Sequence, residues 1–302
     1  MNLKIKRYPF YIGITSLVVV IVLTLTGLFL WISHRESRTA AIQVADRLFS
    51  EINEKTLERY EKALESVAVL AGTAARMPGM AGVPSADDMS HPGMELMFRA
   101  LDSYKYIFST YVGFDDGSFI QVIAIRDQPE LRVLFEAPVG TMYTLRSVFT
   151  DSQGVRKQHW RFLNLEQQVI GKRDNLDLDY DPRTRPWYTR ARQEDTTFFT
   201  APYVFSSTKL PGITCAKSMM DGSGVFGVDI TLVQFSLSLK KQKVSDNGML
   251  FLFDPEGYII AHPEENPIKA GEGDTLSFLH SDDSADPLVR AIVADYRGNP
   301  ES

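Results

Sequence analysis

One short stretch of the chain combines side-chain types that could capture a small charged molecule. Residues 180–191 read Tyr-Asp-Pro-Arg-Thr-Arg-Pro-Trp-Tyr-Thr-Arg-Ala. The two prolines, Pro182 and Pro186, restrict the backbone on either side of Arg185 and disfavour helical geometry at the residue before each of them. We therefore expect a stiff turn, on which the guanidinium offers a planar fork to a carboxylate and Trp187 adds an indole N–H donor.

Two residues farther along the chain could supply a second ring surface and the opposite charge. Tyr203 is another aromatic residue, and Asp229 ends the apolar run Gly-Val-Phe-Gly-Val-Asp. A carboxylate beside aromatic faces is a favourable environment for an ammonium group. With Arg185 facing a carboxylate and Asp229 facing an amine, this set of residues could hold a zwitterion.

The same residues resemble the amino-acid-binding signature of double Cache (dCache) sensor domains. Six positions match the residue types of that family, in the same order and at similar spacing: Tyr180, Arg185, Trp187, Tyr188, Tyr203 and Asp229. In the family, the arginine and tryptophan positions hold the carboxylate of the ligand, and the tyrosine and aspartate positions hold its α-amine. The resemblance covers roughly residues 34–302 and implies an extracytoplasmic sensor for an amino acid or a related zwitterion.

Arg185 also has a purely structural interpretation. It could form an ion pair with an acidic residue just upstream of it in the sequence, namely Asp174, Asp177, Asp179 or Asp181. Arg183 lies two residues earlier and is the better candidate for a surface or structural arginine.

The other five positions have structural alternatives as well. Trp187 and Tyr188 could fill the core of a sheet, or one could face the core while the other faces a pocket. Tyr180 and Tyr203 divide evenly between core packing and pocket lining. Asp229 could cap a helix that starts a few residues later.

Composition and motifs exclude several functional classes. The 302 residues carry a net charge of −6 and no basic cluster with interleaved aromatics, which argues against nucleic-acid binding. The single cysteine, Cys215, excludes an internal disulfide and favours a small buried apolar residue. The acidic run 177–181 lacks the glycine and glutamate of a calcium loop, and the five histidines are scattered. Common catalytic motifs are absent, so we expect no catalytic residue, metal or cofactor, and any enzymatic output domain would lie beyond residue 302.

The N-terminal segment is predicted to cross a membrane. Residues 8–32 are uncharged and largely apolar, and they exceed the roughly 20 residues that a spanning helix needs. Residues 1–7 carry three basic side chains and no acid, which predicts a cytoplasmic N-terminus. A cleaved signal peptide would usually have an apolar core of only about 7–15 residues. We therefore expect an uncleaved anchor in the inner membrane, with the rest of the chain extracytoplasmic (periplasmic).

The spacing of apolar residues predicts a long helix directly after the anchor. In residues 36–77, Val44, Leu48 and Ile52 fall on one stripe, and charged residues occupy the remaining positions. This helix could cover the domain's own sheet, or it could be a stalk that forms a homodimer and carries a signal to the membrane. The two interpretations are compatible.

The remainder of the chain shows the pattern of antiparallel hairpins with helices before and between them. A short helix is expected at 93–104, and apolar β-forming segments flank turn sequences at 107–125, 147–164 and 212–232. A connecting helix at 233–246 precedes a similar hairpin at 249–262, which we interpret as a weak internal repeat. A final helix is expected at 286–296.

These patterns predict an α+β protein in which a long N-terminal helix, serving as membrane anchor plus stalk, precedes tandem PAS-like antiparallel-sheet modules, the second incomplete. The expected divisions are a cytoplasmic N-terminus at 1–7, a transmembrane helix at 8–32, a stalk at 33–78, a ligand-binding membrane-distal module at 79–244 and the start of a membrane-proximal module at 245–302.

The expected function is ligand sensing by a bacterial transmembrane receptor, with a small molecule and the membrane as partners and no nucleic acid. One alternative is a protein-binding or ligand-free tethered module, which predicts a collapsed pocket and an exposed apolar patch. Another is the sensor part of a receptor nucleotide cyclase with a different small ligand.

Overall fold

The computed structural model of the chain describes residues 10–82, 90–126, 128–175, 180–208, 210–233, 236, 239, 248–264, 268–270 and 276–299. The chain divides into two units, Met1–Tyr60 and Glu61–Ser302.

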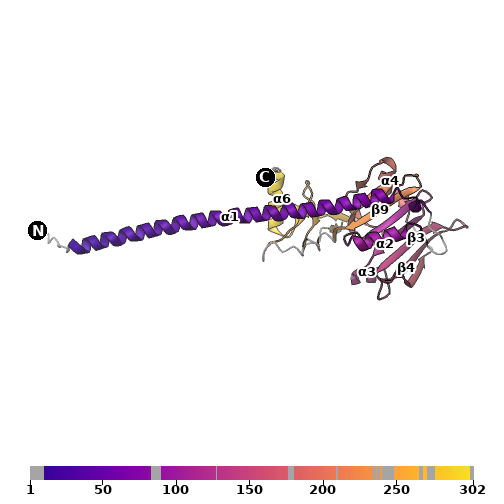
Figure 1. The fold of residues 1–302 in the computed structure, drawn as a ribbon, viewed down its shortest axis with the longest axis horizontal. Helices are drawn as coiled ribbons and strands as arrows, with labels where there is room; N and C mark the ends of the chain where they lie inside the picture. The colour runs from indigo at the N-terminus through magenta and orange to yellow at the C-terminus, as the bar shows by residue number, and fades with distance from the viewer. Residues whose placement is uncertain are drawn as a thin grey trace. The chain divides into compact units, whose positions relative to one another are not determined.

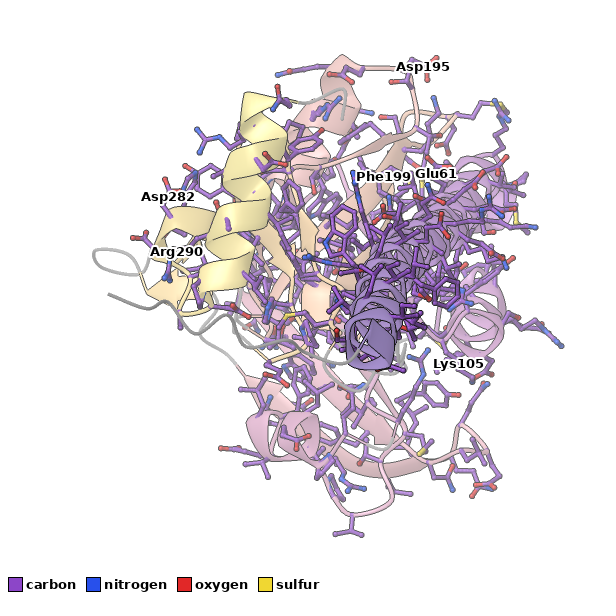
Figure 2. All side chains as sticks on the ribbon, turned by 90° about the vertical axis from the view of Figure 1, so that its left-hand side faces the viewer. Glu61, Lys105, Asp195, Phe199, Asp282 and Arg290 are labelled. Carbon is purple, nitrogen blue, oxygen red and sulfur yellow. The ribbon has the colours of Figure 1, made fainter. Side chains whose placement is uncertain are left out.

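Helix α1 (Phe10–Ala74) is a single uninterrupted helix of 65 residues (Figure 1). Among the described residues, it contains the one segment that is long and apolar enough to cross a membrane, with a mean hydropathy of 2.4 over an 18-residue window. Large apolar side chains are exposed all along the part from Ile14 to Ile32, and side chains radiate around the helix where Figure 2 shows it nearly end-on. The predicted anchor and stalk therefore differ in composition and share one continuous backbone helix.

The second unit is built around a nine-stranded antiparallel sheet. In spatial order, its strands are β5 (Val169–Asn175), β4 (Arg156–Leu163), β3 (Tyr143–Thr150), β2 (Phe119–Ala124), β1 (Ser109–Phe114), β9 (Gly224–Thr231), β8 (Pro211–Ser218) and β6 (Phe198–Phe199), and β7 (Tyr203–Val204) also pairs with β8. The hairpins β1–β2, β3–β4 and β8–β9 are the three that the sequence predicted. In the first, Gly117 has a φ of +83°, which the turn requires and glycine adopts without strain.

One face of this sheet packs against helix α2 (Met94–Ser103) and the last turns of α1. Every second residue of a strand contributes its side chain to this contact, because successive residues point to opposite faces of the sheet. The buried apolar residues of this layer include Val67, Ala71, Met97, Phe98, Leu101, Val112, Ile120, Phe226 and Val228. Cys215 lies in the same cluster and is fully buried, as the sequence indicated.

The opposite face carries shorter elements that the sequence did not predict. These are α3 (Pro129–Leu134), the 3₁₀ turn η2 (Pro182–Thr184) and α4 (Pro186–Gln193). Their aromatic and apolar side chains pack onto the strands in two clusters, one around Trp187 and one around Trp160. The candidate ligand-binding residues lie on this face.

The C-terminal part contains two small two-stranded sheets and a helix. Their elements are β10 (Leu252–Phe253), β11 (Ile259–Ala261), β12 (Ile268–Ala270), β13 (Leu276–Phe278), the 3₁₀ turn η3 (Ser281–Asp283) and α6 (Pro287–Gly298); a further 3₁₀ turn, η1 (Pro78–Ala81), follows α1. The hairpin β10–β11 and helix α6 match the prediction, whereas β12–β13 was not anticipated. The predicted connecting helix at 233–246 lies largely outside the described residues.

The fold class is confirmed: the protein is α+β, with a long N-terminal helix followed by PAS-like antiparallel-sheet domains. The predicted residue limits of the individual domains remain predictions.

Candidate functional site

The two prolines set the backbone around Arg185 as their chemistry dictates. Both preceding residues are extended, with φ and ψ of −123° and 118° at Asp181 and of −84° and 146° at Arg185. Each proline then occupies the first position of a helical element, η2 or α4, where its missing N–H is not needed. The expected stiff turn is therefore a 3₁₀ turn followed by a short helix, and Arg185 is the residue between them.

The register of the sheet aligns the residues that lie beneath this turn. Tyr111 on β1 is paired with Gly227 on β9 and with Gln121 on β2, and Gln121 is paired with Arg146 on β3. Paired residues project from the same face of a sheet. These four positions therefore form a continuous row across four strands.

A second row, two residues along the strands, contains the candidate acid. Asp229 on β9 is paired with Ser109 on β1 and with Thr214 on β8. Asp229 lies within β9, two residues before its end, whereas the apolar run in the sequence suggested that it ends the strand. The antiparallel pairing thus surrounds one carboxylate with hydroxyl side chains.

The Asp229 carboxylate is 3% exposed and accepts three hydrogen bonds. The donors are the hydroxyls of Ser109 at 2.8 Å, Tyr111 at 2.7 Å and Thr214 at 2.6 Å. Burial raises the pKa of Asp229 to about 6, although these hydroxyls oppose the shift. Tyr203 joins the network through its hydroxyl, 2.7 Å from the Thr214 hydroxyl. Among the described residues no cation forms an ion pair with Asp229.

Arg185 is partly buried and turned toward the aromatic residues of the site. Its Nη2 donates to the carbonyl of Val204 at 3.3 Å, and its guanidinium carbon lies 5.8 Å from the ring centre of Tyr203. Within the described part of the chain it has no ion pair with a carboxylate. The nearby acids have other partners, because Asp181 pairs with Arg183 at 2.7 Å and Asp174 pairs with Arg161.

Aromatic residues line the cavity together with Arg185 and Asp229. Trp187 is 2% exposed, and its ring centre is 4.8 Å from that of Tyr111 and 6.4 Å from that of Phe119. Tyr180 packs on Phe119 at 5.0 Å. Tyr188, the neighbour of Trp187 on α4, donates its hydroxyl to Asp115 instead.

The described residues line a narrow cavity at this place, with an internal volume of about 20 Å³. It is lined by Tyr111, Phe119, Gln121, Arg146, Tyr180, Arg185, Trp187, Tyr203, Phe205, Ser206, Ser207 and Asp229. Five of the six residues predicted from the sequence are therefore brought together, and Tyr188 is the exception. This volume holds about one water molecule, so a larger ligand enters only if the lining side chains move apart.

Sequence reasoning missed several lining residues, of which Arg146 and Gln121 are the most polar. Arg146 interrupts the apolar strand sequence Tyr-Thr-Leu-Arg-Ser-Val-Phe, and Gln121 interrupts Phe-Ile-Gln-Val-Ile-Ala. A lone polar residue in an apolar strand was a detectable signal. Which face of the sheet each one occupies depends on the register, which the sequence alone did not provide.

No group of three or more His, Cys, Asp or Glu among the described residues could hold a metal ion. Asp177 and Asp179, which begin the acidic run considered as a calcium loop, lie outside the described residues.

The chain is similar to a family of sensor domains and to two bacterial proteins. Residues 94–236 match the family model of the methyl-accepting chemotaxis protein-like first PDC sensor domain. Adenylate cyclase 1 of Rhizobium meliloti is 24% identical over 255 residues, covering 84% of this chain and 37% of the relative. The methyl-accepting chemotaxis protein McpB of Bacillus subtilis is 35% identical over 122 residues, covering 39% of this chain and 18% of the relative.

A solved structure with a similar chain course is the ligand-binding domain of the Pseudomonas fluorescens chemoreceptor CtaA in complex with L-isoleucine. It is 22% identical, the match covers 76% of this chain and 73% of that chain, and the TM-score is 0.45. The chain spans 37% and 18% of the lengths of the two curated relatives named above. The matched segment 94–236 contains both the sheet and the cavity, and it agrees with the double Cache resemblance at the level of a chemoreceptor-type sensor domain.

Proposed function

We propose that this protein is the extracytoplasmic sensor region of a bacterial transmembrane receptor and that its cavity binds a small amino acid or a related zwitterion. Arg185 and Trp187 hold the carboxylate of the ligand. Asp229 holds its ammonium group, with Tyr180 and Tyr203 at the sides. Tyr188 does not line the cavity; its ring packs edge-on against Trp187, and its hydroxyl donates to Asp115.

The observation that carries this proposal is two opposite charges that line one cavity without a direct ion pair, although the charge of Arg185 lowers the pKa of Asp229 from a distance. Arg185 and Asp229 both line it, and within the described residues neither has an ion-pair partner of the opposite sign. A buried charge without a partner is costly, and a bound zwitterion would supply a counter-charge to each. The narrow volume is also what the alternative of a protein-binding or ligand-free module predicts, so the charged lining and not the volume favours a small zwitterion.

Calorimetric titration of the full 302-residue chain in detergent against the common amino acids tests the proposal. At least one amino acid should bind at micromolar to low-millimolar concentration. The variant Arg185→Ala should weaken that binding tenfold or more, because charge-assisted hydrogen bonds contribute roughly 1.5–3 kcal/mol each.

Arg183→Ala is the matched control, because Arg183 lies two residues away, is exposed and pairs with Asp181. It should leave the affinity unchanged. If no amino acid binds, or if Arg185→Ala binds as well as the parent chain, the amino-acid site is refuted.

The receptor's location and signalling follow from the same proposal. The apolar part of α1 anchors the chain in the inner membrane, with the sensor sheet on the periplasmic side. Ligand binding favours one of two arrangements of the sheet and the adjoining helix, and the shift passes along α1 toward the membrane. A homodimer through the stalk part of α1 belongs to this proposal as well.

The output of the receptor is a second question, and two classes of relative bear on it. The adenylate cyclase match extends over 84% of this chain, whereas the match to the chemotaxis protein McpB covers 39%. The cyclase match supports a nucleotide cyclase as the alternative only weakly, because its identity is 24% against 35% for McpB. The complete coding sequence of the gene distinguishes the two, because catalytic and methyl-accepting domains have unrelated sequences.

A further inference from the structure

Arg146 is a second arginine in the cavity, and the zwitterion proposal gives it no role. It lies on β3, paired with Gln121 on one side and Trp160 on the other. The residue is 5% exposed, so its guanidinium is more deeply buried than that of Arg185. Its side chain nevertheless lines the cavity.

Aromatic rings surround this guanidinium. Its central carbon lies 4.3 Å from the ring centre of Tyr180, 5.3 Å from that of Trp160 and 5.7 Å from that of Phe119. Rings attract a cation through their faces, but they do not neutralise its charge. The pKa of Arg146 falls to about 10, mainly through desolvation, and the nearby positive charge of Arg185 also lowers it. Arg146 therefore lacks the counter-charge that its burial calls for.

The hydrogen bonds of Arg146 leave its outer edge available. Its Nε donates to Oε1 of Gln158 at 2.6 Å. Among the described residues, neither of its two terminal nitrogens has a hydrogen-bond acceptor or a carboxylate partner. Those terminal nitrogens form the part of an arginine that binds a carboxylate through two parallel hydrogen bonds.

The charges of the cavity lining do not cancel. The lining residues include two guanidiniums, Arg146 and Arg185, and one carboxylate, Asp229. An amino acid with an uncharged side chain carries one positive and one negative group, so it would leave one buried guanidinium unpaired. A ligand with one ammonium and two carboxylates would pair all three charges.

We propose, on the basis of the function proposed above, that the ligand is an acidic amino acid whose side-chain carboxylate binds Arg146. Arg185 then holds the α-carboxylate, and Asp229 holds the ammonium group. Arg146 is thus the specificity-determining residue of the site.

Gln121 lies between the two ends of this arrangement and fits it. The residue is 4% exposed, and its Nε2 donates to the Ser109 hydroxyl at 3.0 Å. Its Oε1 is buried and has no hydrogen-bond partner among the described residues. An unpaired buried acceptor is costly, and the ammonium group of a ligand seated between Asp229 and Arg146 could donate to it.

The decisive measurement compares nearly isosteric ligands on the unmodified 302-residue chain in detergent. L-glutamate and L-aspartate are titrated against L-glutamine and L-asparagine by calorimetry at pH 7.5. At least one acidic amino acid should bind tenfold or more tightly than its amide, because the amide cannot satisfy the charge of Arg146.

A charge-removing variant links the preference to the residue. Arg146→Gln should reduce the ratio of acid to amide affinity to within about threefold. Arg99→Gln serves as the matched control, because Arg99 lies on α2, is exposed and pairs with Glu95. That variant should keep the full preference for the acid.

The outcomes separate this inference from the proposal on which it rests. If neutral amino acids bind as tightly as acidic ones to the unmodified chain, the role of Arg146 is wrong and the amino-acid site stands. Equal weakening of acid and amide binding by Arg146→Gln also overturns the inference, because both arginines would then hold one α-carboxylate. If none of the common amino acids binds, the site itself is refuted.

Discussion

At the scale of the residue, the most informative group is the carboxylate of Asp229. Burial favours its neutral form and raises its pKa to about 6, while three hydroxyl donors favour the ionised form and limit the shift. Because the folded-state pKa lies above the ordinary value of 3.8, the unliganded protein loses folding stability as the pH rises through 6 and Asp229 ionises. A bound ammonium group would reverse that preference, because it stabilises the ionised form.

This titration predicts that ligand affinity depends on pH. Only the ionised carboxylate pairs with the ammonium group, so binding should weaken as the pH falls below the pKa of about 6. With that pKa, roughly one site in ten is ionised at pH 5 and nearly all are at pH 7.5, which gives an affinity loss of about tenfold. Calorimetric titrations at the two pH values measure it.

Asp229→Asn is the control for this prediction, because the amide cannot ionise and its weakened affinity should be nearly equal at the two pH values. An unmodified chain that binds equally well at pH 5 and 7.5 would show that Asp229 does not hold the ammonium group.

At the scale of the element, the site depends on the close approach of β1 and β9. Gly227 on β9 is paired with Tyr111 on β1, and the Tyr111 ring lies over the glycine. A Cβ atom at position 227 would lie 2.2 Å from that ring, which no side chain tolerates. The missing side chain of Gly227 thus leaves the space in which Tyr111 reaches Asp229.

Gly227→Ala should therefore damage the site through Tyr111. The methyl group would push the ring away from Asp229 and Trp187, and overpacking of this kind typically costs about 1–3 kcal/mol. We expect a lower unfolding midpoint in urea together with weaker amino-acid binding. Gly298→Ala is the control, because a Cβ at that position of α6 meets nothing within 4 Å. Unchanged stability and binding in Gly227→Ala would mean that the ring position is not fixed by this contact.

At the scale of the whole molecule, one helix connects an apolar segment to the sensor sheet. The apolar part of α1 has the length and composition of a membrane span, and the last turns of the same helix pack on the sheet through Val67, Ala71 and Ala74. A shift in the sheet would therefore act directly on a helix that is continuous with the anchor.

The proposed topology can be measured by labelling an introduced cysteine, because the protein's single native cysteine is buried. Cys215 is fully buried and burial raises its pKa to about 12, so it should not react with a membrane-impermeant maleimide. A cysteine introduced at the exposed Thr150 should be labelled in intact spheroplasts if the sensor sheet is outside the cytoplasm. Labelling of Thr150→Cys only after lysis would place the sheet on the cytoplasmic side, and the unmodified chain reports the background.

The chain's periodicities were sufficient to predict most elements. Runs of apolar β-forming residues on both sides of turns that contain Asp and Gly predicted the hairpins β1–β2, β3–β4 and β8–β9, and a helical stripe predicted the later part of α1. Short elements were missed, notably α3, α4, β5 and the pair β12–β13. Such segments carry too few residues to show a period, and their conformation depends on packing against the large sheet.

The sequence by itself determined the residue types of the site and the local backbone at Arg185, because proline acts on its immediate neighbours. It did not determine which strands adjoin, and that pairing brings Asp229 beside Ser109 and Thr214 and adds Gln121 and Arg146 to the cavity. The face and neighbours of a strand residue are set by contacts between segments far apart in the chain. For the same reason only the tertiary structure separated Tyr188, bonded to Asp115, from Trp187 beside it.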